Sequence, residues 1–266
     1  MNAMTANDLS SINMNMELPT TLYAANGHTL FWLGITDESA FRCNTYLIVD
    51  QHEAIIVDPG SKQHFSQVKQ RVAQIVPPEK VSGMVLCHQD PDVAASMTDW
   101  LDLNPAMRVF TSPRTQVLLP HYGRSDYDYY DVTEEPLYKL PSGASLKFIE
   151  SPFLHFPGAF TTYDTQSRYL FSGDIWAALD LDWTLTVDSF EEHVPKMNLF
   201  HLDYMGSNLV ARGFVRRIEN LAIDAILPQH GSIIGPQHVA AALDYLRNLR
   251  CGADIIYADL ESNHGG

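Results

Sequence analysis

Short apolar runs recur along the chain, and the stretches between them are long enough to form helices. Seven of the runs have the length and composition of β-strands. They cover residues 46–49, 54–57, 84–87, 108–111, 146–149, 169–172 and 225–227. The segments between several of these runs have helical spacing, so the pattern predicts strands and helices in alternation.

The predicted helices differ in how clearly their ends are marked. Residues 64–75 place apolar side chains three, four and three positions apart, starting at Phe65. Residues 93–103, 185–205 and 209–221 are also predicted to be helical. A last helix is expected to begin at Pro236 and to end at Gly252, a residue type common just past a helix C-terminus. The alternation as a whole predicts an α/β fold built in layers.

Residues 121–136 interrupt this alternation, because they are rich in Tyr and Asp. We expect a surface loop there, which would cover a pocket, form a dimer contact or simply face solvent. The segment 185–205 is expected to lie near the functional site.

The chain of 266 residues is long enough for one large α/β domain. Residues 1–16 are polar and lack the charged and apolar regions of a signal peptide. We therefore expect a flexible arm over residues 1–20 and a single domain over residues 21–266. No run of about eighteen apolar residues occurs, so no transmembrane helix is expected.

The chain is strongly acidic, with 17 Lys and Arg against 32 Asp and Glu and a formal net charge of −15. This balance disfavours a nucleic-acid polymer or an anionic membrane as partner, because both require basic surface. The three cysteines, Cys43, Cys87 and Cys251, are odd in number and widely spaced, which does not suit a disulfide framework. A reduced, cytoplasmic setting is expected, with Cys87 buried inside an apolar run.

Candidate chemistry begins directly after the run 84–87. Residues 88–92 read His-Gln-Asp-Pro-Asp and so place His88, Asp90 and Asp92 at alternate positions. Side chains two apart on extended backbone point to the same side, which suits a metal site. Three further candidate ligands, His155, Asp174 and His230, each follow or end another apolar run.

Each of these residues also has an ordinary structural interpretation when taken singly. His155 beside two phenylalanines could line a core, Asp92 and Asp174 could cap helices, and His230 could stand in a turn. The six together, in this order along the chain, favour a metal site.

The order H-x-D-x-D, His, S-G-D and P-x-H-G resembles that of the metallo-β-lactamase superfamily. The hairpin ending at Asp58-Pro59-Gly60 is similar to the early hairpin of that fold. The resemblance covers residues from about 30 to 257 and implies a four-layer αββα sandwich. It also implies metals at one edge of the sheets.

Two positions depart from the H-x-H-x-D-H pattern of the superfamily's hydrolases. Asp90 replaces the second histidine, and Val93 replaces the last. A carboxylate at the first of these positions resembles the flavodiiron proteins and their oxygen-binding di-iron relatives (ODP), although those usually have Glu. The segment 228–234 and the residues around Cys251 resemble the ODP group most.

The resemblance implies a ligand set. Metal one would take His88, Asp90 and His155. Metal two would take Asp92 and His230. It would have one ligand fewer than in the hydrolases, because Val93 cannot bind a metal. Asp174 would bridge the two. Imidazoles mixed with carboxylates suit non-haem iron, so two iron ions are expected, with manganese or zinc as alternatives.

The resemblance also bears on partners. Flavodiiron reductases carry a flavodoxin-like domain whose FMN supplies electrons, and no such domain is expected after residue 266. The chain is therefore expected to use an external electron-donor protein. O2 or NO are the expected small-molecule partners, and a homodimer is a further expectation.

The remaining histidines and one tyrosine are weaker candidates. His193 and His201 lie in the segment expected to cover the metals and could support or gate the site. Tyr204 could hydrogen-bond a ligand of the metals or could be a core tyrosine. The others are expected to be solvated: His28, His52, His64, His121, His238 and His264.

Three functions remain open from the sequence. The first is binding or reduction of O2 or NO at a di-iron site. The second is hydrolysis, with a metal-bound hydroxide oriented by Asp92 and a phosphodiester such as a cyclic dinucleotide as substrate. The third is a non-catalytic O2 or redox sensor that uses its metals for binding or structure.

Overall fold

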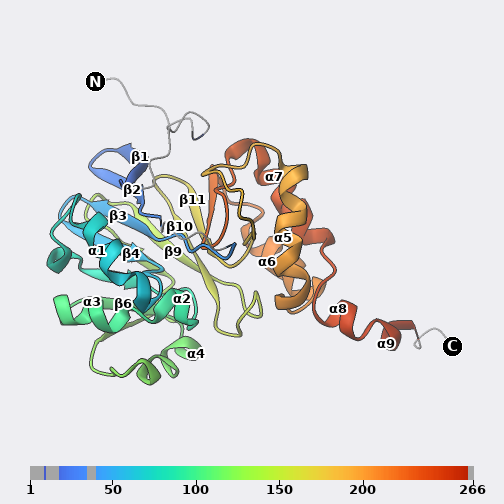
Figure 1. The fold of residues 1–266 in the computed structure, drawn as a ribbon, viewed down its shortest axis with the longest axis horizontal. Coiled ribbons are helices and arrows are strands. Elements are labelled where there is room, and N and C mark those ends of the chain that lie inside the picture. Colours follow the sequence, from blue (N-terminus) through green and yellow to red (C-terminus); the bar gives the residue numbers. More distant parts are fainter. Residues whose placement is uncertain (1–8, 10–17, 35–39, 263–266) are drawn as a thin grey trace.

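The computed structural model describes residue 9, residues 18–34 and residues 40–262, and within these ranges two β-sheets face each other (Figure 1). The first sheet has the strand order β1 (Thr20–Ala25), β2 (His28–Trp32), β3 (Tyr46–Asp50), β4 (Glu53–Val57), β5 (Gly83–Val85), β6 (Arg108–Thr111) and β7 (Asp128–Asp131). The second has the order β12 (Ala225–Pro228), β11 (Tyr169–Gly173), β10 (Phe160–Asp164), β9 (Ser145–Glu150) and β8 (Leu137–Lys139).

Helices lie on the outer sides of this pair of sheets, as Figure 1 shows. On one side are α1 (Phe65–Val72), α2 (Pro91–Ala94), α3 (Met97–Leu103) and α4 (Pro113–Gln116). On the other are α5 (Phe190–Tyr204), α6 (Asn208–Ile218) and α7 (Val239–Asn248). The short helices α8 (Ala253–Ile256) and α9 (Ala258–Ser262) extend away from the body. Within the described part of the chain, every helix is too short or too polar to cross a bilayer.

Alternation along the strands explains the layers. In β4, Ile55 and Val57 pack into the core between the sheets, whereas Ala54 and Ile56 pack into the core beneath α1 and α3. In β11, Leu170 likewise faces the core beneath α5, α6 and α7. Because successive strand residues point to opposite faces, a strand that is apolar throughout requires cover on both sides. The arrangement is the expected αββα sandwich.

All seven predicted strands are present, but three predicted helices differ from the structure. The last of them ends at Asn248 and not at Gly252, because Leu249 has extended backbone and Gly252 instead precedes α8. The segment 93–103 is not one helix, because α2 ends at Ala94 and α3 begins at Met97. The break follows from Ser96, whose N–H donates to Gly60 O and whose hydroxyl donates to Pro59 O. In the segment 185–205, the helix begins only at Phe190, because the backbone of residues 185–187 pairs with Ile233 instead.

The prediction of a surface loop over residues 121–136 was only partly correct, because most of the segment lies at the surface but is not all loop. These residues include β7, which pairs in parallel with β6 at the sheet edge. The ring centroids of Tyr130 and Phe110 lie 4.9 Å apart, so Tyr130 packs against the core and does not only face solvent. Strands β1, β2, β8 and β10 were not predicted from the sequence either.

Histidine 28 was expected to be solvated, and this prediction was wrong. Its side chain is fully buried, with Nδ1 2.7 Å from Asp50 Oδ2 and Nε2 3.1 Å from Asp164 Oδ2. Asp50 ends β3 in one sheet and Asp164 ends β10 in the other, so His28 joins the two sheets. His52, His64, His121 and His238 are exposed or half-buried as expected, and His264 lies outside the described residues.

Most of the expected N-terminal arm also lies outside the described residues. Within it the structure describes Leu9, which is buried in the core between the sheets. From Thr20 onward the chain forms β1, so a separate arm over residues 1–20 remains an expectation.

Candidate metal centre

The candidate ligands come together because of strand direction. Strands β4, β5 and β6 are parallel to one another, as are β11 and β12. The carboxyl ends of parallel strands meet at one edge of a sheet, and His88, Asp174 and His230 follow β5, β11 and β12 there. His155 follows β9, which runs in the same direction as β11 because both are antiparallel to β10.

One group of donors forms around the first part of the motif. Nε2 of His155 lies 3.3 Å from Asp90 Oδ2, and Nε2 of His88 lies 3.6 Å from the same oxygen. Oδ2 of Asp174 lies 2.8 Å from Nε2 of His155 and 3.2 Å from Nε2 of His88. These four side chains therefore surround one point.

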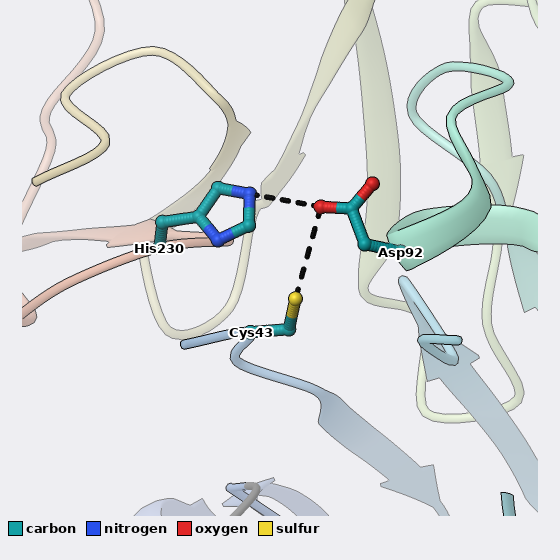
Figure 2. Close-up of side chains that lie close together, drawn as sticks. All are labelled: Cys43, Asp92 and His230. Atoms are coloured by element: carbon teal, nitrogen blue, oxygen red, sulfur yellow. Dashed lines mark hydrogen bonds and ion pairs between the residues drawn. The ribbon is translucent and has the colours of Figure 1, made fainter. Parts of the chain in front are cut away.

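A second group forms on the other side of Asp174. Nε2 of His230 lies 3.1 Å from Asp92 Oδ2 and 3.4 Å from Asp174 Oδ1. Cys43 belongs to this group as well, with Sγ 3.7 Å from Asp92 Oδ2. Figure 2 shows Cys43, Asp92 and His230 pointing toward one another from separate segments of the chain.

The turn at Pro91 explains why the two motif carboxylates separate. The chain leaves β5, and Pro91 stands in the first turn of α2, where its fixed φ suits a helix start. Asp90 thus precedes the helix and faces the first group, whereas Asp92 lies on the helix and faces the second. Extended backbone alone would predict that the three motif residues face one common point. The structure instead divides them between the two groups.

The charges in the site stabilise one another. Burial raises the pKa of Asp174, but the imidazoles of His88, His155 and His230 outweigh it and hold the pKa well below its usual value. Burial lowers the pKa of His155, but Asp174 and Asp90 outweigh it and raise the pKa to about 9. The carboxylates are therefore ionised at neutral pH and available to a cation.

The outer ring nitrogens fix the orientation of two imidazoles. Nδ1 of His230 lies 2.9 Å from Arg42 O, and because a carbonyl oxygen can only accept, Nδ1 is the donor and Nε2 faces Asp92 and Asp174. Nδ1 of His88 lies 3.1 Å from Cys87 Sγ. The N–H of Cys87 donates to Asp58 Oδ1, which ties the ligand loop to the turn after β4.

The two histidines on α5 have different surroundings. His201 is fully buried, and its Nε2 accepts a hydrogen bond from the N–H of Trp176, two residues after Asp174. His193 is also buried, but its Nε2 has no hydrogen-bond partner among the described residues. His201 thus supports the loop of a candidate ligand, whereas no contact in the described structure ties His193 to one.

Aromatic rings border the site. The ring of Phe41 lies 3.9 Å from that of His230. The ring of Tyr204 stacks on Phe200 at 4.5 Å and lies 5.9 Å from His155, with Tyr204 57% exposed. Val93 is fully buried in the core beneath α1 and α3, so its side chain packs with apolar neighbours.

Orphaned polar atoms show that the residues fit a cation. Nε2 of His230 and Oδ1 of Asp174 are buried and lie within ion-pair distance of each other, but neither has a hydrogen bond of good geometry among the described residues. Leaving such atoms unsatisfied costs about 1–3 kcal/mol each, and a cation between them would satisfy both. Imidazoles and carboxylates are donors that suit iron, manganese or zinc.

Two contributors to the site were missed from the sequence. For Cys43 the sequence predicts only a cysteine outside any disulfide framework, and nothing in its immediate sequence marks it as a site residue. Gln229 lies next to His230, and its Nε2 contacts Asp92 Oδ2 at 3.3 Å, so it orients the carboxylate. Adjacency to a candidate ligand was the one signal that could have identified Gln229.

The arrangement of these ligand groups in an αββα sandwich can be compared with known proteins. The family model described as ODP family beta lactamase matches residues 41–231. The chain belongs to this family. Membership confirms the resemblance to the oxygen-binding di-iron branch of the superfamily.

A chemotaxis sensor ODP, solved as a peroxy diiron species, superposes with a TM-score of 0.80 and 34% identity, covering 90% of this chain and 98% of that one. Diflavin flavoprotein A 1 of a Synechocystis species is 25% identical over 203 residues, covering 72% of this chain and 34% of that protein. A nitric oxide reductase of Moorella thermoacetica is 28% identical over 202 residues, covering 71% of this chain and 49% of that protein. The chain thus spans about a third to a half of the length of these curated relatives.

Proposed function

We propose that this ODP family protein holds two iron ions between its two ligand groups and uses them to bind O2 or NO, as a sensor rather than as a hydrolase. The observation that carries the proposal is the donor set, in which Asp90 takes a position that is histidine in the superfamily's hydrolases. The similarity to a chemotaxis sensor over 98% of that sensor's length supports it. The similarity to a nitric oxide reductase supports NO as an alternative ligand.

In this proposal His88, Asp90 and His155 hold metal one, and Asp92 and His230 hold metal two. Asp174 would face both ions, since its Oδ2 lies beside the first group and its Oδ1 beside the second. When bound, two ferrous ions supply electrons that can be shared with a diatomic gas.

The chain's own residues set the conditions for that chemistry. Three carboxylates offset most of the charge of two divalent cations, so the site can remain largely buried without a large unpaired charge. The carbonyl of Arg42 holds the ring of His230 with Nε2 toward the site. The rings of Phe41, Phe200 and Tyr204 line the approach to the imidazoles and reduce the access of water.

The proposal is tested by loading the protein with ferrous iron in the absence of oxygen and then admitting O2 or NO. We expect about two iron ions per chain, a new visible absorption band and gas uptake in proportion to iron. Asp174→Asn, which removes the charge shared by both ligand groups, should abolish these signals. The matched control is Asp126→Asn, at an exposed carboxylate, which should keep them.

Two results would contradict the proposal. The first is an iron-loaded protein that neither changes its spectrum nor takes up gas. The second is turnover of a phosphodiester panel by the zinc-loaded or manganese-loaded protein without any response to O2, because this would favour the hydrolytic alternative.

A further inference from the structure

Cys43 lies where a ligand of metal two would have to lie. It precedes β3, which is antiparallel to β4, so the start of β3 lies at the same edge as the ends of β4 and β5. An isolated bridge pairs Cys43 with His230 and fixes the two residues side by side. Position in the sheet, rather than proximity in sequence, brings this thiol to the site.

The distances around Cys43 match those of ligands that share one ion. One donor atom each from Cys43, Asp92 and His230 lie within 4.8 Å of one another. Donors bound to zinc at about 2.0–2.3 Å in tetrahedral geometry lie roughly 3–4 Å apart. The measured separations are 3.7 Å from Sγ to Asp92 Oδ2 and 3.1 Å from that oxygen to His230 Nε2.

A hydrogen bond from the Cys43 thiol to Asp92 is the simpler interpretation, but it leaves the site incomplete. His230 is 1% exposed and its Nδ1 is occupied by Arg42 O, whereas its Nε2 lies 3.1 Å from Asp92 Oδ2 without the geometry of a hydrogen bond. The thiol proton can satisfy only one acceptor. An ion between the three side chains would satisfy all of them together.

We infer that Cys43 binds metal two as a thiolate and supplies the ligand that Val93 cannot. The inference rests on the proposed binuclear site and adds a ligand to it. The thiol loses its proton to solvent as the ion binds, as for other cysteine ligands.

Charge supports a thiolate at this position. Three carboxylates carry three negative charges, and a thiolate adds a fourth, which balances two divalent cations. Sulfur is also a softer donor than oxygen, so metal two would favour iron or zinc over manganese, whereas metal one would discriminate less. The two metals would thereby differ in chemistry, although their sites face each other across Asp174.

The test uses the full chain, reduced and free of metal, titrated with Co(II) in the absence of oxygen. A thiolate bound to Co(II) gives an intense near-ultraviolet charge-transfer band that nitrogen and oxygen ligands do not give. We expect this band with the wild type and with Cys251→Ala, a buried cysteine that follows α7. We expect its loss in Cys43→Ser and Cys43→Ala.

The serine variant separates the two interpretations, because a hydroxyl can still donate a hydrogen bond to Asp92 but is a poor metal ligand. If Cys43 is a ligand, both variants weaken binding of the second ion by about tenfold or more. If Cys43 only donates a hydrogen bond, Cys43→Ser binds both ions like the wild type, which overturns the inference. X-ray absorption of the zinc-loaded protein should show one sulfur at about 2.3 Å per two zinc ions.

The outcomes distinguish this inference from the proposed function. Two bound ions without a sulfur signal overturn the role of Cys43 alone. A chain that binds neither cobalt, zinc nor iron contradicts both. Alkylation of Cys43 at the same rate with and without zinc, measured by peptide mass spectrometry, would count against ligation independently of any spectrum.

Discussion

The main-chain N–H of Trp176 donates a 2.9 Å hydrogen bond to Nε2 of His201. Nδ1 of His201 lies 2.9 Å from Met197 O, so the ring bridges α5 and the loop that carries Asp174. Burial lowers the pKa of His201 to about 4, so the ring is neutral and can accept this bond at neutral pH. Helix α5 therefore holds the backbone two residues after Asp174, the residue proposed to bridge the metals.

His201→Ala should weaken metal binding although His201 is not a proposed ligand. The change leaves the buried N–H of Trp176 without a partner, which costs about 1–3 kcal/mol. Partners behind metal ligands typically contribute about 10–100-fold to affinity, and a loss in this range is expected in competition with a chelator. His193→Ala on the same helix is the control and should leave affinity unchanged. Equal losses in both variants would mean that the effect comes from α5 as a whole.

Asp174 and Asp90 should differ in how many metals they hold. Asp174→Asn removes the charge shared by both groups, so metal analysis after dialysis should find almost no metal. Asp90→Asn removes a donor from the first group only, so about one ion per chain should remain. If Asp90→Asn also releases both ions, the division of the carboxylates between two metals is incorrect.

The sequence indicated the fold and six candidate ligands because both depend on local patterns. His88, Asp174 and His230 each follow an apolar strand, and parallel strands end at one edge. Whether all six bind metal stays a prediction. β10 was missed because Thr161 and Thr162 interrupt its apolar pattern, although both are buried.

Long-range partners explain the other differences. Cys43 reaches the site through the antiparallel pairing of β3 with β4 and is 45 positions before His88 in sequence. The carboxylates around His28 come from 22 and 136 residues further along the chain. No window of sequence contains such relationships, so burial of this histidine could not be inferred.

The hydroxyl of Tyr204 can be tested separately from its aromatic ring. Tyr204→Phe keeps the stack on Phe200, so metal content should be unchanged and the free energy of unfolding should change by less than about 0.5 kcal/mol. If the hydroxyl assists gas binding, the dissociation rate measured by stopped flow should rise about 2–10-fold, as for loss of one hydrogen bond. Tyr204→Ala removes the cover over His155 and should have the larger effect. A rate identical to wild type in Tyr204→Phe would exclude the phenol from the chemistry.

His28 should make stability depend on pH at a position far in sequence from every proposed ligand. Burial alone would lower the pKa of His28, but Asp164 and Asp50 outweigh it, so the pKa is raised. Burial would raise the pKa of Asp164, but His28 and Ser167 outweigh it, so that pKa is lowered. The charged histidine and carboxylate therefore coexist in the folded protein over a wider pH range than in the unfolded chain.

The signs of the two shifts define where this ion pair contributes. The histidine contribution is complete below the unfolded value near 6.5 and is lost as pH rises through the raised pKa. The carboxylate contribution is complete above the unfolded value near 3.8 and is lost as pH falls through the lowered pKa. His28→Gln should therefore lower the free energy of unfolding most between about pH 4 and 6.5, by about 3–5 kcal/mol, because it leaves buried carboxylates unpaired. Urea unfolding of the metal-free protein should show that the difference in free energy of unfolding between wild type and His28→Gln becomes smaller toward pH 9. The control is His52→Gln at an exposed site, whose free energy of unfolding should stay within about 0.5 kcal/mol of wild type. If the difference in free energy of unfolding between wild type and His28→Gln is constant from pH 5 to 9, His28 is not charged in the folded protein.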